Sequence, residues 1–84
     1  MKNICPVCGY DELDEPAYKG MRASLEICPC CGFQFGFDDQ ALHITHEQWR
    51  QKWVTNGMKW RSSGIKPPAN WNPQKQLLNI GVKI

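Results

Sequence analysis

Two short segments of the sequence share one pattern of residues. Residues 4–10 read ICPVCGY and residues 27–33 read ICPCCGF, so both follow I-C-P-x-C-G-aromatic. Two cysteines separated by two residues can place both sulfurs on one metal ion, about 2.3 Å from it. Together the segments predict a single four-thiolate site, formed by Cys5, Cys8, Cys28 and Cys31.

The residues around the cysteines suit tight turns about a metal. A proline follows the first cysteine of each turn and fixes φ at about −65°. A glycine follows the second cysteine, where it supplies a positive φ. This backbone directs N–H groups at the first sulfur and so spreads the thiolate charge. The 19 residues between Cys8 and Cys28 fall in the range typical of zinc ribbons.

Zinc is the expected metal, because four thiolates on a small protein suit an ion that needs no redox chemistry. Iron is the alternative, since tetrahedral sulfur ligation does not distinguish the two metals. Four protein ligands leave no coordination position open for water or substrate, which is typical of structural zinc. We therefore expect one structural Zn²⁺ and no enzymatic activity, and metal removal should unfold the N-terminal half.

The fifth cysteine and the two histidines leave alternatives open. Cys30 lies where the first turn has Val7, so it is expected to be a free thiol that points away from the metal. It could fill a turn position, or act as a redox sensor or a nucleophile activated by His43 or His46. These histidines are three residues apart and could form a second metal site, or be a loop residue and a helix-start residue.

The 84 residues are expected to make one small domain, residues 1–84, whose charge is unevenly divided. Residues 1–40 carry three basic and seven acidic side chains, a net −4; residues 41–84 carry seven basic and one acidic, a net +6. The halves could attract each other, or the basic half could face an acidic partner. Lacking a basic–apolar leader and an apolar run of about 20 residues, the chain is expected to be cytoplasmic, with reduced thiols and no membrane association.

Residues 1–40 are expected to form a β-rich, metal-binding half. KNIC and SLEIC are β-compatible runs before the cysteine turns, DELDEPAYKGMRAS predicts an exposed loop or hairpin, and FQFGF alternates as a strand does. The alternation predicts Phe33, Phe35 and Phe37 on one face, against the core. Asp38 and Asp39 are expected to cap or end this strand rather than act as an acid–base pair.

Residues 41–84 are expected to be the helical, basic, tryptophan-rich half. Thr45 at the N-cap and Gln48 three residues later form a capping box, which predicts a helix over 45–57. The glycine at its end terminates it in a left-handed conformation. Trp49 and Trp53 are four residues apart and share one face.

A second short helix is expected after the loop SSGIKPPAN, whose two prolines exclude helix. Asn72 at the N-cap, Pro73 at the first position and Gly81 as the stop define it. The tail VKI could add an edge strand or fray. The buried side of the helix is expected to consist of Leu77, Leu78 and Ile80.

Four tryptophans alternate with basic residues in this half. Aromatic rings among cations suit single-stranded nucleic acid, whose bases stack while its phosphates are neutralised. The same pattern describes a small domain that uses its largest rings as core, and an exposed tryptophan suits a protein partner. The residues expected to contact a partner are Trp49, Arg50, Trp53, Lys59, Trp60 and Arg61.

The sequence resembles the small bacterial cysteine-rich proteins of CPCC type, which are zinc-ribbon-like. The resemblance rests on ICPVCGYDELDEP, ICPCCGFQFGFDD, WRQKWVTNGMKW and PPANWNP, and so spans most of the chain. It implies a bacterial source and no established activity, and its ligands match Cys5, Cys8, Cys28 and Cys31. The cysteine turns are also similar to those of rubredoxins, which hold one iron. Rubredoxins, however, carry a longer stretch between the turns and no basic tryptophan-rich half, which favours zinc here.

Motifs and resemblance together predict a small α+β domain: an N-terminal zinc ribbon with rubredoxin-like knuckles and short antiparallel β-structure, followed by two short α-helices. The sequence contains no phosphate-binding loop, serine elbow or His–Glu metal helix, so no small-molecule substrate is evident. The expected function is binding of a macromolecule, a protein before a nucleic acid, as an adaptor or as the immunity partner of a toxin by analogy with other small bacterial proteins. A rubredoxin-like electron carrier is the remaining alternative.

Overall fold

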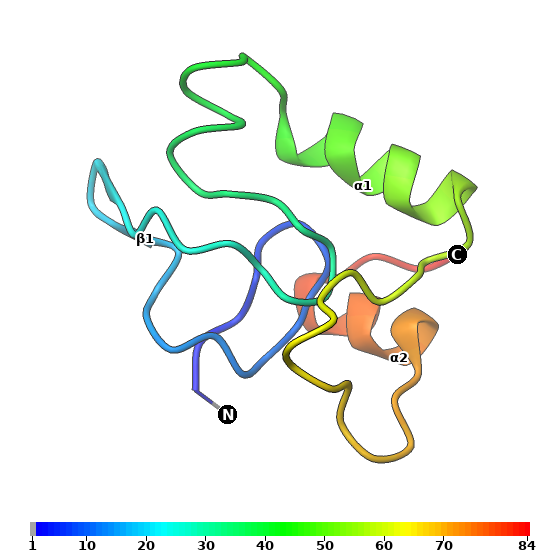
Figure 1. The fold of residues 1–84 in the computed structure, drawn as a ribbon. Helices are drawn as coiled ribbons and strands as arrows, with labels where there is room; N and C mark the ends of the chain where they lie inside the picture. The colour runs from blue at the N-terminus through cyan, green and yellow to red at the C-terminus, as the bar shows by residue number, and fades with distance from the viewer. Residues whose placement is uncertain (1) are drawn as a thin grey trace.

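Regular secondary structure occupies only short parts of the chain. The computed structural model describes residues 2–84. Two strands and two helices are present, in the order β1 (Tyr18–Lys19), β2 (Arg22–Ala23), α1 (His46–Thr55) and α2 (Pro73–Leu77), and a 3₁₀ turn, η1 (Leu78–Ile80), continues α2. The two cysteine turns lie between α1 and α2 (Figure 1). Within the described residues, no helix has the length and apolar character that crossing a membrane requires.

The β-structure of residues 1–40 is smaller than predicted. The strands β1 and β2 form an antiparallel hairpin, with Tyr18 opposite Ala23, in the polar stretch that predicted a loop or hairpin. The runs before the cysteine turns contribute only single bridges, one of which pairs Asn3 with Leu13. The tail after Gly81 forms no strand.

The stretch FQFGF, predicted as a strand, forms a turn. A single bridge pairs Gln34 with Ile27, and the chain then curls back on itself. Two carboxylates close the turn: Asp38 accepts the backbone N–H of Gln34 at 2.8 Å, and Asp39 accepts that of Gly36 at 2.7 Å. The aspartates therefore act as caps, as predicted, but they cap a turn rather than a strand.

Because the backbone reverses here, the three phenylalanines do not share one face. Phe33 and Phe35 are fully buried, whereas Phe37, at the reversal, is 46% exposed. The prediction that all three face the core was wrong for Phe37. An alternating pattern fixes the direction of side chains only while the backbone stays extended.

Helix α1 begins and ends as its sequence predicts. The Thr45 hydroxyl accepts the N–H of Gln48 at 3.0 Å, and the Gln48 side chain accepts the N–H of Thr45 at 2.9 Å, which completes the capping box. At the other end, Gly57 has a φ of 97°, and the Met58 N–H donates to the Trp53 carbonyl at 2.8 Å. This is the Schellman arrangement that a glycine after a helix favours.

Helix α2 also begins where predicted, because the Asn72 side chain accepts the N–H of Lys75 at 3.0 Å. Leu77 is fully buried and Ile80 is half-buried, three residues later on the tighter 3₁₀ turn. Leu78 is 51% exposed, so its predicted place on the buried side was wrong. In a 3₁₀ helix residues three apart lie on the same side, so Ile80 follows Leu77 toward the core and Leu78 points outward.

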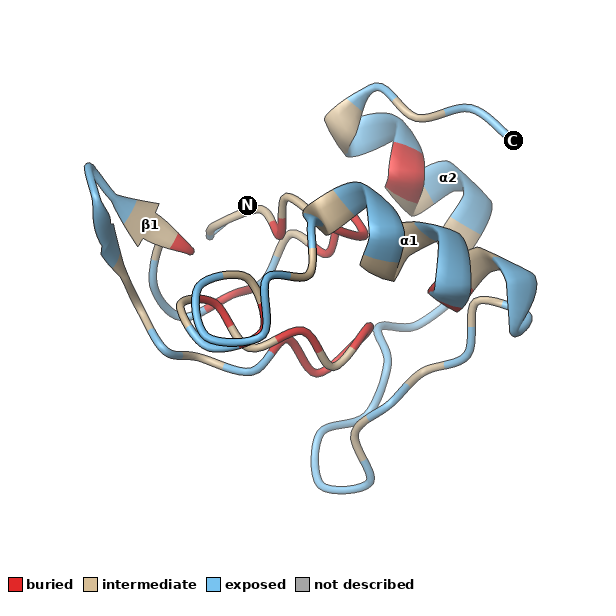
Figure 2. Cartoon of the chain, turned by 90° about the horizontal axis from the view of Figure 1, so that it is seen from above, coloured by how far each residue is buried: buried red, intermediate tan, exposed pale blue. Residues whose placement is uncertain are grey.

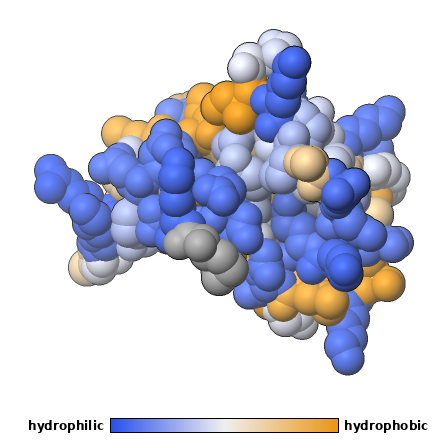
Figure 3. Space-filling view, turned by 90° about the horizontal axis from the view of Figure 1, so that it is seen from below, coloured by the Kyte–Doolittle hydropathy of each residue, from blue (hydrophilic) through white to orange (hydrophobic). Residues whose placement is uncertain are grey.

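The core is built around the cysteine turns rather than between the helices (Figure 2). Each helix contributes one buried side chain, Trp53 from α1 and Leu77 from α2. Among residues 2–84 the two helices do not pack against each other. The face in Figure 3 is largely hydrophilic, with apolar side chains in separate patches. The fully buried large side chains and cysteines are Phe33, Phe35, Leu13, Leu77, Val7, Cys5, Cys8, Cys28 and Cys30.

Candidate metal centre

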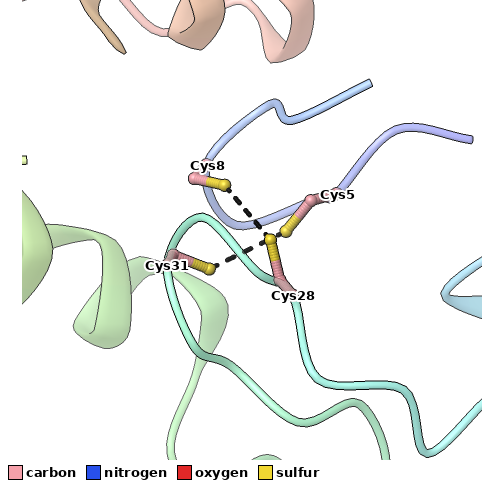
Figure 4. A group of neighbouring side chains, drawn as sticks. All are labelled: Cys5, Cys8, Cys28 and Cys31. Atoms are coloured by element: carbon pink, nitrogen blue, oxygen red, sulfur yellow. Dashed lines mark hydrogen bonds between the residues drawn. The ribbon is translucent and has the colours of Figure 1, made fainter. Parts of the chain in front are cut away.

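Four cysteine sulfurs from the two turns point toward one another (Figure 4). The Sγ atoms of Cys5, Cys8, Cys28 and Cys31 all lie within 4.8 Å of one another, and these residues are at most 2% exposed. Cys5 Sγ is 3.9 Å from Cys31 Sγ, and Cys8 Sγ is 3.7 Å from Cys28 Sγ. A tetrahedral ion with metal–sulfur bonds of about 2.3 Å would hold its ligands about 3.8 Å apart. The four cysteines predicted as ligands are therefore placed so that they could bind one metal ion.

The two cysteine turns have the same backbone conformation. In each, the first cysteine donates its N–H to the carbonyl of the aromatic residue five positions later, at 2.7 and 3.0 Å, and its carbonyl accepts the glycine N–H, at 2.9 and 2.8 Å. Gly9 and Gly32 have φ values of 86° and 81°. The Val7 N–H points at Cys5 Sγ, 3.4 Å away, which is the kind of contact that disperses thiolate charge.

Burial and the neighbouring sulfurs shift the pKa values of the clustered thiols. Burial raises the pKa of Cys8, and hydrogen bonds with the other sulfurs raise it further. The pKa of Cys31 is raised by its hydrogen bonds with Cys28 and Cys5 and by burial. Burial also opposes ionisation of Cys5, but hydrogen bonds from the neighbouring sulfurs outweigh it and lower the pKa of Cys5. Without a cation the cluster therefore holds fewer than four thiolates, and a metal must displace protons to bind.

Side chains from the second half hold the first cysteine turn by its carbonyls. Arg50, on α1, donates from Nε and Nη2 to the carbonyls of residues 7 and 6, at 2.7 and 3.0 Å. Gln76, on α2, donates to the carbonyl of residue 8 at 3.0 Å. Asn79, in η1, donates to the carbonyl of residue 9 at 2.9 Å. Four consecutive carbonyls of this turn are thus bonded to residues more than 40 positions away in the chain.

The second cysteine turn is held in a similar way. The backbone N–H groups of Ser62 and Arg61 donate to the carbonyls of residues 29 and 30, at 2.9 and 3.0 Å. The indole N–H of Trp49 donates to the carbonyl of residue 31 at 3.0 Å. Across both turns, residues beyond position 41 are hydrogen-bonded to the backbone that carries the cysteines, and these bonds join the two halves.

The Arg50 contacts lead to a stability prediction. Arg50→Ala should lower the free energy of unfolding of the metal-loaded protein by about 2 kcal/mol, because two shielded carbonyls lose their donors. Arg50→Lys should recover little, since one ammonium group does not reproduce the two-pronged guanidinium. The measurement is urea unfolding, with the exposed Arg22→Ala as control. An Arg50→Ala loss no larger than that of Arg22→Ala would contradict the assigned contacts.

Cys30 lies outside the sulfur cluster. It is fully buried, and the Gln76 amide nitrogen lies 3.2 Å from its Sγ. Burial denies it contact with an oxidant or substrate, which favours the interpretation of Cys30 as a packing residue in the turn.

The tryptophans are built into the fold. The indole N–H groups of Trp53 and Trp60 donate to the carbonyls of residues 59 and 65, at 2.9 and 2.7 Å. Trp49 packs edge-on against Phe33, with centroids 5.5 Å apart, and Trp60 against Tyr10 at the same separation. Of the six residues predicted to contact a partner, Arg50 and the three tryptophans thus use their polar groups internally. The Lys59 and Arg61 residues remain exposed.

His46 joins the hairpin to the start of α1. The Tyr18 hydroxyl donates to the Asp39 carboxylate, and His46 Nε2 lies 2.8 Å from the same hydroxyl oxygen. Because the single hydroxyl proton goes to Asp39, neutral His46 must carry its proton on Nε2 and donate it. His43 is exposed, and among residues 2–84 neither histidine belongs to a cluster of three or more potential metal ligands. The alternative of a histidine metal site therefore gains no support.

His46 gives a testable pH dependence. Burial lowers the pKa of His46 below 6.5; the Asp39 carboxylate opposes this shift and the Arg50 guanidinium adds to it. The unfolded chain therefore binds this proton more tightly, and stability is lost as the pH falls below about 6.5. The stability advantage of the wild type over His46→Gln should shrink between about pH 8 and pH 5.5.

Comparing the two proteins at each pH removes the pH dependence of metal binding, which they share. His43→Gln is the control, and its difference from the wild type should stay flat with pH. Parallel profiles for His46→Gln and the wild type would show that His46 titrates alike in the folded and unfolded chains.

Comparison with known proteins identifies two bacterial relatives. The chain is 33% identical over 69 residues to the uncharacterised protein YoaQ of Bacillus subtilis (strain 168), a match that covers 64% of this chain and 58% of YoaQ. It is 27% identical over 71 residues to the uncharacterised protein YozI of the same organism, covering 66% of this chain and 59% of YozI. The chain thus spans less than two thirds of either relative. No family model and no solved structure matches it significantly.

Proposed function

We propose that the chain is a non-enzymatic zinc-ribbon protein of the CPCC type, in which one structural Zn²⁺ holds a small cytoplasmic fold that binds a partner protein. The ligands are Cys5, Cys8, Cys28 and Cys31. The observation that carries the proposal is the buried cluster of four sulfurs, with S···S distances of 3.7 and 3.9 Å. Four thiolates fill the coordination sphere of zinc and leave no position for a substrate.

The bonding of the second half to the cysteine turns supports a structural role for the metal. Seven carbonyls of the two turns accept hydrogen bonds from residues 49–79. The metal therefore fixes the scaffold on which the helices rest. A chain of this size has little stability to spare, so a metal that links its two turns would decide whether it folds.

A binding role is supported by the charge that the fold leaves exposed. Residues 41–84 carry a net +6, and their lysines stay exposed while the tryptophans pack inward. An acidic protein partner suits this surface, and an adaptor or toxin-immunity role is the class of function proposed. Nucleic acid is the second candidate, since cations beside aromatic rings also suit phosphates and bases.

Two measurements test the proposal. Elemental analysis of freshly purified, colourless protein should find about one zinc per chain. A red protein with one iron would instead support the rubredoxin-like alternative. Affinity capture with the metal-loaded chain should then recover a specific protein, and Cys31→Ser should lose it. Recovery of nucleic acid alone, removed by raising the salt concentration, would replace the protein partner by the second candidate.

A further inference from the structure

Two neighbouring cavities form a groove along α1. The first has a volume of about 450 Å³ and lies between the end of α1 and residues 59–61. The second has a volume of about 550 Å³ and lies beside the start of α1. Trp49 and Lys52 line both cavities, so the two lie next to each other along α1. Each volume is in the range of cavities that take a small ligand or a few side chains.

The first cavity is lined by three cationic side chains, Lys52, Lys59 and Arg61, and by no carboxylate. The buried Cys31 also lines it. Among residues 2–84 none of these three cations forms an ion pair. Their charges are therefore available to an anionic ligand.

The aromatic walls of this cavity offer ring surface only. Trp49, Trp53 and Trp60 line it, and each indole N–H is already bonded to a backbone carbonyl of the same chain. A ligand here would gain apolar contact with the rings and charge contact with the lysines and Arg61. Asn56 supplies an exposed amide at the rim.

The second cavity has a different character. Ile44 and Trp49 give it apolar surface, while Gln48 and Gln51 give it uncharged amides. Its lining includes one acidic residue, Glu47, and no cation other than the shared Lys52. A nucleic acid lying along the groove would carry phosphates along its whole length. Its phosphates would contact cations in the first cavity but would be repelled by Glu47 in the second. A peptide needs charge at only one end, so the groove fits a peptide better than a nucleic acid.

From this polarity we infer that the groove binds an extended acidic segment of a partner protein. Carboxylates of the segment lie at Lys52, Lys59 and Arg61, and an apolar side chain lies against Trp49 and Ile44. The inference rests on the proposed function and names the surface and the chemistry of its partner. Charge complementarity at one end and apolar contact at the other fix the direction of the segment.

Selection from a displayed library of random peptides tests the chemistry. Metal-loaded wild-type protein should enrich peptides that combine several Asp or Glu residues with a nearby apolar residue. The double variant Lys52→Glu and Lys59→Glu replaces two positive charges that line the groove with two negative ones. Lys66→Glu with Lys83→Glu makes the same change of net charge at exposed positions outside the groove, and serves as the control.

Fluorescence anisotropy with the most enriched peptide then tests the site. The groove variant should bind at least about tenfold more weakly than the wild type, and the control should stay within about twofold. Absence of acidic enrichment, or equal losses in both variants, would overturn the inference. So would an oligothymidylate that binds the wild type more tightly than the peptide and loses affinity in the groove variant.

This test is separable from that of the proposed function. A partner captured by the wild type that binds the groove variant equally well would overturn the groove while leaving the protein-binding role intact. A chain that captures no protein and enriches no peptide would overturn both.

Discussion

Metal removal by a strong chelator is expected to unfold residues 41–84 together with residues 1–40. The two helices do not contact each other, and each is held through the carbonyls of the cysteine turns. When the turns lose their ion, α1 and α2 lose the surface on which they pack, and helices of 10 and 5 residues are too short to persist alone. A metal bound by four thiolates would contribute on the order of 10 kcal/mol, more than a domain of this size can replace.

The measurement is the amide dispersion in a proton–nitrogen correlation spectrum before and after chelation. Resonances from His46–Thr55 should collapse with those of the cysteine turns. This goes further than the sequence-based expectation, in which only the N-terminal half unfolds. Dispersed α1 resonances in the metal-free protein would show that the second half folds on its own.

Two adjacent cysteines provide the matched variants. Cys31→Ser removes a member of the sulfur cluster and should leave the chain unfolded at ordinary metal concentrations. Cys30→Ser changes an equally buried neighbour outside the cluster, and should keep one metal per chain at a cost of about 1–2 kcal/mol. Equal damage from both substitutions would contradict the four-cysteine ligand set.

Features set by local sequence were predictable. The capping box at Thr45, the left-handed Gly57 and the N-cap at Asn72 each depend on residues within one turn of helix. The two cysteine turns belong to the same class, because their repeat in the sequence implies the same backbone twice. Their convergence followed from metal chemistry, which needs four sulfurs around one ion.

Features set by distant contacts were not predictable. Gln76 and Asn79 hold the first cysteine turn from across the chain, and neither has a sequence feature that sets it apart from a surface amide. Ser62 bonds to the second cysteine turn through its backbone N–H, a group that any residue except proline carries. The errors at Phe37 and Leu78 have the same origin, since a reversal and a 3₁₀ turn redirected side chains that simple periodicity had assigned.

The tryptophan-rich half shows most clearly that the sequence alone does not predict tertiary contacts. Rings among cations predicted either a core or a binding surface, and the structure places the tryptophans against the core while leaving part of some rings lining a cavity. Trp49 packs on Phe33 and bonds to the second cysteine turn, yet it also lines the groove along α1. Only the tertiary structure shows which part of each ring is covered, so composition alone could not separate the two interpretations.

Gly9→Ala is expected to be the most damaging glycine substitution in the chain. Gly9 has a φ of 86°, where an L-residue is strained, and a Cβ there would lie 3.0 Å from the carbonyl carbon of Gln76 and closer still to its oxygen. That obstacle is the backbone of α2, which cannot move without weakening the bonds of Gln76 and Asn79 to the turn. We expect a loss of at least about 3 kcal/mol in the free energy of unfolding of the metal-loaded protein.

Two other glycines separate backbone strain from collision. Gly20 has a φ of 60°, and a Cβ added there would have no neighbour within 4 Å. Gly20→Ala should therefore cost only about 1 kcal/mol, from backbone strain alone. Gly32→Ala repeats the conformation of Gly9 in the second turn, but its Cβ would meet Arg61 Cγ, 2.9 Å away on an exposed and flexible side chain. Urea unfolding should therefore rank the losses as Gly20 below Gly32 below Gly9. Equal losses for Gly9 and Gly32 would mean that the backbone of α2 moves aside as easily as a surface side chain. The hydrogen bonds of Gln76 and Asn79 to the first cysteine turn would then contribute little to stability.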